Sequence, residues 1–306
     1  MSTTTQNRRK RPQMVEGVPV PGLPERIIKA IVLAVICLLV IIPFMGIIST
    51  SLASPAEVVQ AGGFVLFPTN IDFTAYRSIL TGGVVAQALL VSGFITIVGT
   101  ALSLFLTGLL GWALSRRGTI GNRPMLLLVL VSLLFNPGMI PSYLVVQQLG
   151  LLDSLWALIV PTSVSAFNVI VVRAFFTELP SELIESATID GATEWQLFRH
   201  IGLPLSRAVL AVVGLFYGVG YWNSFFNALL YINDTDKWPL QLVLRTYVVN
   251  DVPLGAQDLG AAAEAMPPQT SIQMAILMIS ILPILLAYPF LQRHFAKGML
   301  TGAVKG

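Results

Sequence analysis

The sequence predicts an all-α membrane protein with six transmembrane helices. Three observations support this: 55% of the 306 residues are hydrophobic, only 11% are charged, and the apolar residues gather in long runs. Soluble domains normally contain about 25% charged residues, so lipid must surround most of this chain. The strands of a membrane β-barrel would alternate apolar and polar residues. These runs do not alternate, so we expect helices.

Six runs are long enough to be membrane spans, because a helix needs about 20 residues to cross roughly 30 Å of hydrocarbon. They lie at approximately 28–49, 86–114, 125–148, 154–176, 207–231 and 271–291. Small residues in the second run would let neighbouring membrane helices approach closely; they are Gly93, Gly99, Ser103, Thr107 and Gly108. We therefore predict a packed bundle.

The basic residues predict the orientation of the spans, because cytoplasmic loops of membrane proteins are enriched in lysine and arginine. Arg77, Lys237 and Arg245 fall on one side, and the other fifteen of the 18 basic residues fall on the opposite side. Both termini and the 177–206 loop are therefore expected in the cytoplasm.

The regions outside the spans have distinct expected roles. Residues 1–24 should form a disordered cytoplasmic tail, followed by a six-helix domain over 25–292 and a cytoplasmic tail over 293–306. A signal peptide is an alternative for the N-terminus, although its apolar run exceeds the usual 7–15 residues. The outer loops 50–85 and 232–270 are long enough to carry function. Within the second, a short ordered helix that faces a partner is expected at 240–249.

Several kinds of chemistry find no support in the sequence. One cysteine, Cys37, excludes an internal disulfide, and two distant histidines, His200 and His294, supply almost no metal ligands. We expect no cofactor, and a net charge of +3 does not suggest nucleic acid. An intramembrane protease would need an HExxH motif, or a serine paired with histidine or lysine at membrane depth. The chain has neither, so an enzyme is not predicted.

The energy for transport must also come from elsewhere. Ion-coupled transporters use ionisable residues within the membrane, whereas the polar residues inside these spans are uncharged. They are Gln87, Asn136, Gln147, Asn168, Asn223, Asn227 and Gln273. The chain lacks the GxxxxGK[ST] loop that binds ATP. A separate subunit is therefore expected to supply the energy.

The cytoplasmic loop between the fourth and fifth spans carries the most informative pattern. Residues 178–207 read ELPSELIESATIDGATEWQLFRHIGLPLSR. Pro180 and Ser181 are typical of a helix start, and Asp190-Gly191 should interrupt that helix. The loop thus begins with one short helix and a turn.

A second helix should follow the turn. Thr193 and Gln196 have the spacing of a capping box, and this helix should run to about His200 and end before Pro204. The apolar residues of both helices exceed what a solvated loop exposes, so some should pack on the bundle and some on a partner. These are Leu183, Ile184, Ile189, Trp195, Leu197, Phe198 and Ile201.

The spacing in this loop resembles the EAA motif of ATP-binding-cassette (ABC) importer permeases. Glu185-Ser186-Ala187 is followed by Gly191, Ile201 and Leu203-Pro204, with Ser186 standing where alanine is usual. Further segments resemble the carbohydrate-uptake branch of that family, especially the second permease of maltose and alginate importers. They are PTNIDFTAY from Pro68, PGMIPSYLVVQQLGLL from Pro137, GYWN from Gly220 and GMLTGAVKG from Gly298.

This resemblance implies an ABC importer permease fold with cytoplasmic EAA coupling helices, in the inner membrane of a bacterium. The implied partners are a second homologous permease, two copies of an ABC ATPase and an extracytoplasmic solute-binding protein that contacts loop 232–270. The implied ATPase-docking residues are Glu185, Ser186, Ala187, Asp190, Gly191, Ala192, Phe198, Ile201, Leu203 and Pro204. The tail residues implied at the ATPase interface are Lys297, Gly298, Lys305 and Gly306.

A solute pathway for sugars would combine amides for hydroxyl groups with aromatic faces for the apolar side of the ring. The fifth span offers both in Tyr217, Tyr221, Trp222, Asn223 and Asn227. Ordinary packing and interhelical hydrogen bonding are the alternative role for these residues. An ABC permease for a non-sugar solute, or a channel that works without an ATPase, also stays open at this stage.

Overall fold

The computed structural model describes residues 14–15, 18–19, 22–116, 118–255, 258–259 and 267–303, with 290–303 described by backbone alone. These residues are almost entirely helical, and the prediction of an all-α chain is confirmed. The described strands are the two-residue β1 (Met14–Val15) and β2 (Val18–Pro19), which pair antiparallel.

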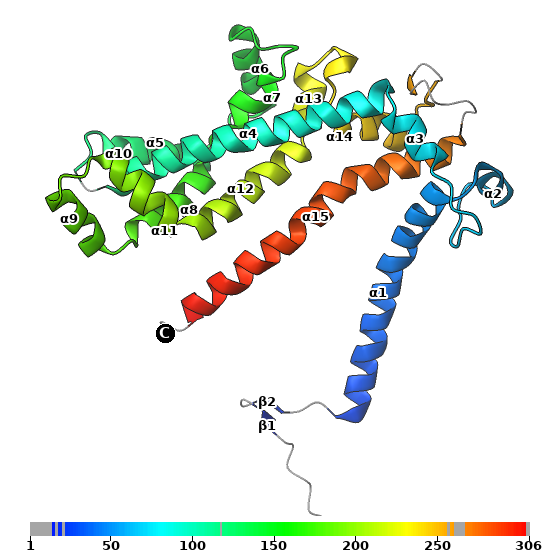
Figure 1. The fold of residues 1–306 in the computed structure, drawn as a ribbon, viewed down its shortest axis with the longest axis horizontal. Helices are drawn as coiled ribbons and strands as arrows, with labels where there is room; N and C mark the ends of the chain where they lie inside the picture. The colour runs from blue at the N-terminus through cyan, green and yellow to red at the C-terminus, as the bar shows by residue number, and fades with distance from the viewer. Residues whose placement is uncertain are drawn as a thin grey trace, which may run out of the picture.

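Three predicted spans lie within continuous helices. The first lies within α1 (Leu23–Leu52), the second within α4 (Gly83–Ser115) and the sixth within α15 (Gln269–Ala303). In Figure 1, α4 runs the length of the bundle, α12 and α15 lie beneath it, and α1 diverges from them. Most side chains of α1 up to Met45 are exposed, as expected of a helix whose surroundings are lipid or another chain.

The other three predicted spans are interrupted. Residues 125–148 form α5 (Asn122–Leu134) and α6 (Met139–Gln148). Residues 154–176 form α7 (Trp156–Ile159), η1 (Val160–Thr162) and α8 (Ala166–Thr177), with a 50° bend. Residues 207–231 form α12 (Arg207–Trp222) and α13 (Phe226–Tyr231).

The expected count of six spans is therefore not confirmed. Among the described residues, three helices are long and apolar enough to cross a membrane, or up to five if each bent pair is one span. The break at Phe135–Gly138 divides the third predicted span, because Pro137 lacks an N–H and Gly138 adopts φ +83°. Neither α5 nor α6 alone reaches spanning length.

Short helices and turns fill the two loops predicted to face outward. The first loop contains α2 (Pro55–Gln60) and α3 (Thr74–Leu80), and the second contains η3 (Thr235–Lys237). The short helix expected at 240–249 is present as α14 (Leu240–Leu244) and the π-helical η4 (Arg245–Val249). A buried cluster that includes Ile79, Leu240 and Ile272 joins α3 and α14 to the start of α15.

Small residues allow α4 to pack closely on α12 and α8, as predicted. A β-carbon at Gly99 would lie 2.8 Å from the ring of Tyr221, and one at Gly111 would lie 2.9 Å from Val172. Gly93, by contrast, has nothing within 4 Å of its β-carbon position. The small residues at Gly99 and Gly111 are therefore used for close packing, whereas the one at Gly93 is not.

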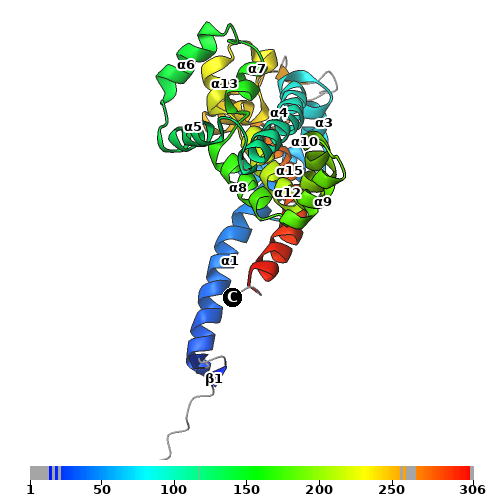
Figure 2. The same ribbon diagram turned by 90° about the vertical axis from the view of Figure 1, so that its left-hand side faces the viewer.

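The remaining segments gather at the end of the bundle that the sequence predicts to be cytoplasmic. They are α9 (Ser181–Ile189), α10 (Glu194–Leu197), η2 (Phe198–Gly202) and α11 (Leu203–Leu205). Seen from this end, α5 and α6 lie to one side of α4, α12 and α15 (Figure 2). Five arginines belong to segments that start or finish here: Arg116, Arg123, Arg173, Arg199 and Arg207.

The predicted tails fall largely outside the described residues. Of residues 1–24, the structure describes β1, β2 and the start of α1. Of residues 293–306, the backbone continues α15 as far as Ala303. Lys297 and Gly298 are described by their backbone alone, and Lys305 and Gly306 lie outside the described residues.

Candidate functional site

The predicted helix–turn–helix of the cytoplasmic loop is present as α9 and α10. Gly191 reverses the chain between them with φ +84°, a conformation that residues with a β-carbon adopt at a cost. The predicted capping box is confirmed. The side chain of Gln196 accepts a hydrogen bond from the Thr193 N–H at 2.7 Å, and the hydroxyl of Thr193 accepts one from the Gln196 N–H at 3.4 Å. We call residues 181–205 the docking segment.

The end of the docking segment differs from the prediction. The chain does not leave the helix before Pro204 but continues through the wide π-helical turn η2 and through α11. It then bends by 82° into α12. Pro204 lies at the start of α11, directly after this π-helical turn, and has no N–H to donate to the carbonyls of the preceding turn.

The apolar residues of the docking segment divide between the bundle and the surface. Ile184, Leu197 and Phe198 are buried. Leu183, Trp195 and Ile189 are exposed, and Ile189 is 86% accessible. Phe198, one of the residues predicted to dock, therefore faces the interior of this chain.

Six of the other predicted docking residues line one of two hollows. Glu185 lines a cleft of about 780 Å³ between α9 and the ends of α4 and α8, together with Arg116. A smaller hollow of about 320 Å³ between α9 and α10 is lined by Ala187, Asp190, Gly191, Ala192 and Ile201, among others. Ser186 is exposed on α9, and Leu203 and Pro204 are half-buried in α11.

A pocket that hydroxyl and amide side chains line together with Phe167 and Phe216, and that we call the polar pocket, contains part of the predicted solute pathway. It holds about 480 Å³ between η1, α8 and α12, and its lining includes Tyr217, Tyr221 and Asn227. The Tyr217 hydroxyl lies 2.7 Å from that of Thr107, and the Tyr221 hydroxyl lies 2.8 Å from that of Ser103. Both hydroxyls thus bond to α4, while the aromatic rings form the pocket wall.

The sequence analysis missed several residues of this pocket. Thr162, Ser165 and Ser224 line it, as does Asn168, which the sequence showed only as an uncharged polar residue of a span. Serine and threonine are common in the interiors of membrane bundles, so their identity alone gave no signal. The break between η1 and α8 brings Thr162 and Ser165 to the face of α12, and Ser224 lies in the turn between α12 and α13.

Two residues predicted for the pathway do not line this pocket. Asn223 is exposed and donates to the carbonyl of Val219 in its own helix at 2.9 Å. Trp222 is buried on another face, where its indole N–H donates to the Ser280 carbonyl at 2.9 Å. Consecutive residues of a helix point about 100° apart, so Tyr221 and Trp222 cannot serve one surface.

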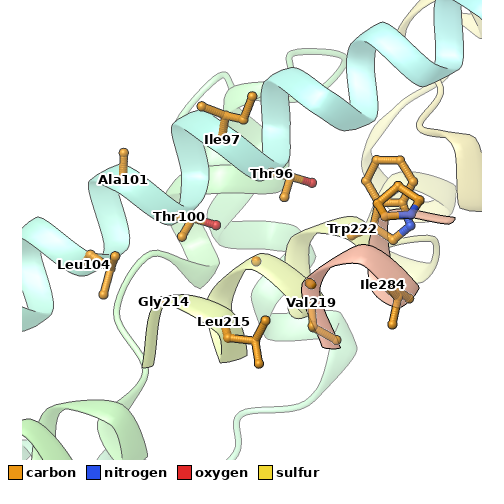
Figure 3. Close-up of a pocket in the computed structure, with 13 residues that line it drawn as sticks. Thr96, Ile97, Thr100, Ala101, Leu104, Gly214, Leu215, Val219, Trp222 and Ile284 are labelled. Carbon is orange, nitrogen blue, oxygen red and sulfur yellow. The ribbon is translucent and has the colours of Figure 1, made fainter. Parts of the chain in front are cut away.

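Trp222 instead lines an apolar cavity of about 480 Å³ between α4, α12 and α15 (Figure 3). Gly214 and Leu215 of α12 and Ile284 of α15 form other parts of its wall. The hydroxyls of Thr96 and Thr100 are buried beside it and have no hydrogen-bond partner among the described residues. With so few polar groups, this cavity is unlike a sugar site.

A group of charged residues, which we call the charged clamp, joins two segments of the chain at the end of the bundle opposite the docking segment. The carboxylate of Asp153 accepts hydrogen bonds from the backbone N–H groups of Asn233 at 3.1 Å and Asp234 at 3.0 Å. The Asp234 N–H is the main cause of a lowered pKa for Asp153, and Lys237, at 3.7 Å, contributes too. The pKa of Lys237 is raised, chiefly by its hydrogen bond to Asp234.

Comparison with known proteins adds a family match. Residues 108–301 match the family described as "Binding-protein-dependent transport system inner membrane component". This stretch includes the docking segment, the polar pocket and the second of the long outer loops.

Individual relatives match nearly the whole chain. Two are from Bacillus subtilis (strain 168). The polygalacturonan/rhamnogalacturonan transport system permease protein YtcP is 45% identical, with 90% of this chain and 96% of the relative covered. Protein LplC is 49% identical, with 87% and 90% covered. A crystal structure of a bacterial ABC transporter involved in the import of the acidic polysaccharide alginate is 30% identical, with a TM-score of 0.81, and covers 91% of this chain and 100% of its own.

Proposed function

This chain belongs to the family of binding-protein-dependent transport system inner membrane components, and we propose that it is the permease subunit of an ATP-driven oligosaccharide importer. The carrying observation is the 45% identity, over 90% of this chain, to a permease of a polygalacturonan/rhamnogalacturonan transport system. The fold similarity to an alginate importer supports the same substrate class. A non-sugar solute has no comparable support among these relatives.

The docking segment is the surface we propose for an ATPase. Exposed Ile189 and Trp195 offer apolar contact, and Glu185 offers a carboxylate beside a cleft. The segment is held on the bundle by buried Ile184, Leu197 and Phe198, so a force on its exposed side would reach the spans. Hydrolysis of ATP would then take place on the partner subunit.

The polar pocket is our candidate for this chain's half of the solute pathway. Its lining combines aromatic faces with the neutral polar side chains of Asn168, Asn227 and Ser224. Neutral amides and hydroxyls can exchange hydrogen bonds with sugar hydroxyls without holding a charged partner. In the proposed complex a second homologous permease completes the pathway, and an extracytoplasmic binding protein delivers the sugar to the α14–η4 end.

The orientation follows the distribution of charge. We propose that the docking segment and both termini face the cytoplasm of a bacterial cell, because arginines gather at the docking end. Cysteines introduced singly at Ser186 and at Asp236, in a Cys37→Ser background, test this in intact cells. An impermeant thiol reagent should label only the second position.

The function is tested by reconstituting the complete complex. The chain is co-expressed with a homologous permease and an ABC ATPase, purified through a tag on this chain, and placed in proteoliposomes with a solute-binding protein. We expect two ATPase copies to co-purify and ATP hydrolysis to rise with an acidic oligosaccharide from pectin or alginate. Stimulation by amino acids or phosphate, but by no glycan of a broad panel, would overturn the carbohydrate assignment. Solute flux without any ATPase would indicate a channel.

A further inference from the structure

Glu194 joins the docking segment to the end of α4 through both of its carboxylate oxygens. Its Oε2 accepts a hydrogen bond from the indole N–H of Trp112 at 3.3 Å. Its Oε1 accepts one from the guanidinium of Arg116, also at 3.3 Å. The Arg116 guanidinium lies over the Trp112 ring, 5.3 Å from its centroid. Glu194 thus forms one closed contact with two side chains of α4 that lie about 80 positions earlier in the chain.

The charged part of this contact cannot by itself hold the segment. The side chain of Glu194 is 64% exposed, and exposed ion pairs stabilise a fold only weakly. Each carboxylate oxygen nevertheless accepts from a different side chain, so the two hydrogen bonds together fix where the carboxylate lies relative to the indole N–H. The carboxylate therefore orients the Trp112 ring more than it stabilises the chain.

The mechanical part of the contact is the ring of Trp112, which is 6% exposed. It packs edge-on against Phe176 of α8, with 5.3 Å between centroids, and against Phe198 of η2 at 5.8 Å. On a third side it lies on Gly202, where a β-carbon would lie only 2.7 Å from the ring. Because packed interiors resist small displacements, η2 cannot shift without moving the ring.

Helix α4 connects this contact to the polar pocket. Trp112 belongs to α4, and further along the same continuous helix, on the side that faces α12, Thr107 and Ser103 bond to Tyr217 and Tyr221. Those tyrosines form the wall of the polar pocket. A continuous helix with hydrogen bonds at fixed positions transmits a displacement along its axis.

We propose that Trp112, oriented by Glu194, is the positioning residue that carries movement of the docking segment through α4 to the polar pocket. This inference rests on the proposed function, since it requires an ATPase to move the segment. Arg116 completes the carboxylate contact, and Gly202 is required so that the ring can sit against η2.

The test measures sugar molecules imported per ATP hydrolysed in proteoliposomes that contain the complete complex. This ratio does not depend on how much complex folds, so a merely structural role would not change it. Gly202→Ala displaces the ring, and Trp112→Phe keeps an aromatic ring but removes the indole N–H. Each should lower the ratio by about 2- to 30-fold, the range that mutations along a coupling path produce. Gly93→Ala, on an open face of α4, is the matched control.

Glu194 provides a second, milder probe. Glu194→Gln keeps an oxygen that can accept the indole N–H, so its ratio should stay closer to wild type than that of Glu194→Ala. An unchanged ratio in Trp112→Phe and Glu194→Ala, with the ATPase still bound, would overturn the inference and leave the proposed function standing. A wild-type complex without sugar-stimulated hydrolysis would instead overturn the proposed function, and the inference with it.

Discussion

The ring of Tyr221 lies directly against Gly99: a β-carbon on the glycine would come 2.8 Å from the Cε2 and Cζ atoms of the ring and 2.9 Å from Cε1. The same tyrosine bonds to Ser103, one turn further along α4. The contact between α4 and α12 thus depends on the absence of a side chain at Gly99 and on the hydroxyl of Ser103. Close approach of this kind is how membrane helices gain packing energy when water supplies no driving force.

Gly99→Ala should therefore destabilise the bundle. Inserting a methyl group into a packed interior costs about 1–3 kcal/mol, because either Tyr221 or α4 must move. Unfolding of the purified protein in mixed micelles measures the change. Gly93→Ala is the control on the same helix, since its β-carbon would meet nothing within 4 Å. Equal stability of the two variants would contradict the packing described above.

Glu185→Ala should weaken binding of the proposed ATPase. If the carboxylate forms a buried charged pair in the complex, its loss costs about 2–5 kcal/mol. The amount of ATPase that co-purifies, and the rate of uptake, should both fall. Glu182→Ala is a matched control, because it removes a carboxylate from the same exposed helix but away from the cleft. Normal uptake in Glu185→Ala would remove this residue from the docking surface.

Asn227→Ala should raise the substrate concentration needed for half-maximal uptake without loss of ATPase from the complex. A lost neutral hydrogen bond is worth about 0.5–1.5 kcal/mol, which is roughly a 2- to 12-fold change. Asn223→Ala is the control four positions away, because Asn223 bonds to its own helix and does not line the polar pocket. Similar kinetics in the two variants would argue against the pocket as part of the pathway.

Asp153 should give the protein a pH-dependent contribution to stability. Its pKa is lowered in the folded state, so the stabilising effect is present above the ordinary value of 3.8 and is lost as pH falls through the lowered pKa. Asp153→Asn should lower the melting temperature at pH 7 and show a smaller further loss at pH 3 than wild type. Asp236→Asn, nearby at the same end of the bundle, controls for general acid effects. A parallel pH dependence in wild type and Asp153→Asn would contradict the clamp.

Local features of the chain were predictable from sequence because they depend on neighbours within a few positions. The helical, apolar runs follow from hydropathy over a window, and the capping box follows from the three-residue spacing of Thr193 and Gln196. The short helix after Trp238-Pro239 is likewise where its sequence indicated. The motif at Glu185 is defined by the distances between its residues along the chain, and these distances do not depend on tertiary packing.

Tertiary structure alone decided which faces these elements present. Phe198 and Ile189 are both apolar residues of one segment, yet one is buried against Trp112 and the other is 86% exposed. Tyr221 and Trp222 are adjacent, yet they line different cavities.

The physical reason is that a side chain's role depends on what approaches it from elsewhere in the chain. Glu194 meets Arg116 from 78 positions away, and Tyr221 meets Ser103 from 118. No local pattern contains such a partner. The sequence by itself determined that this chain is a helical membrane protein with a two-helix loop at Glu185, for which we propose docking. The packing of α4 against α8, η2 and α12 decided how that loop connects to the pocket.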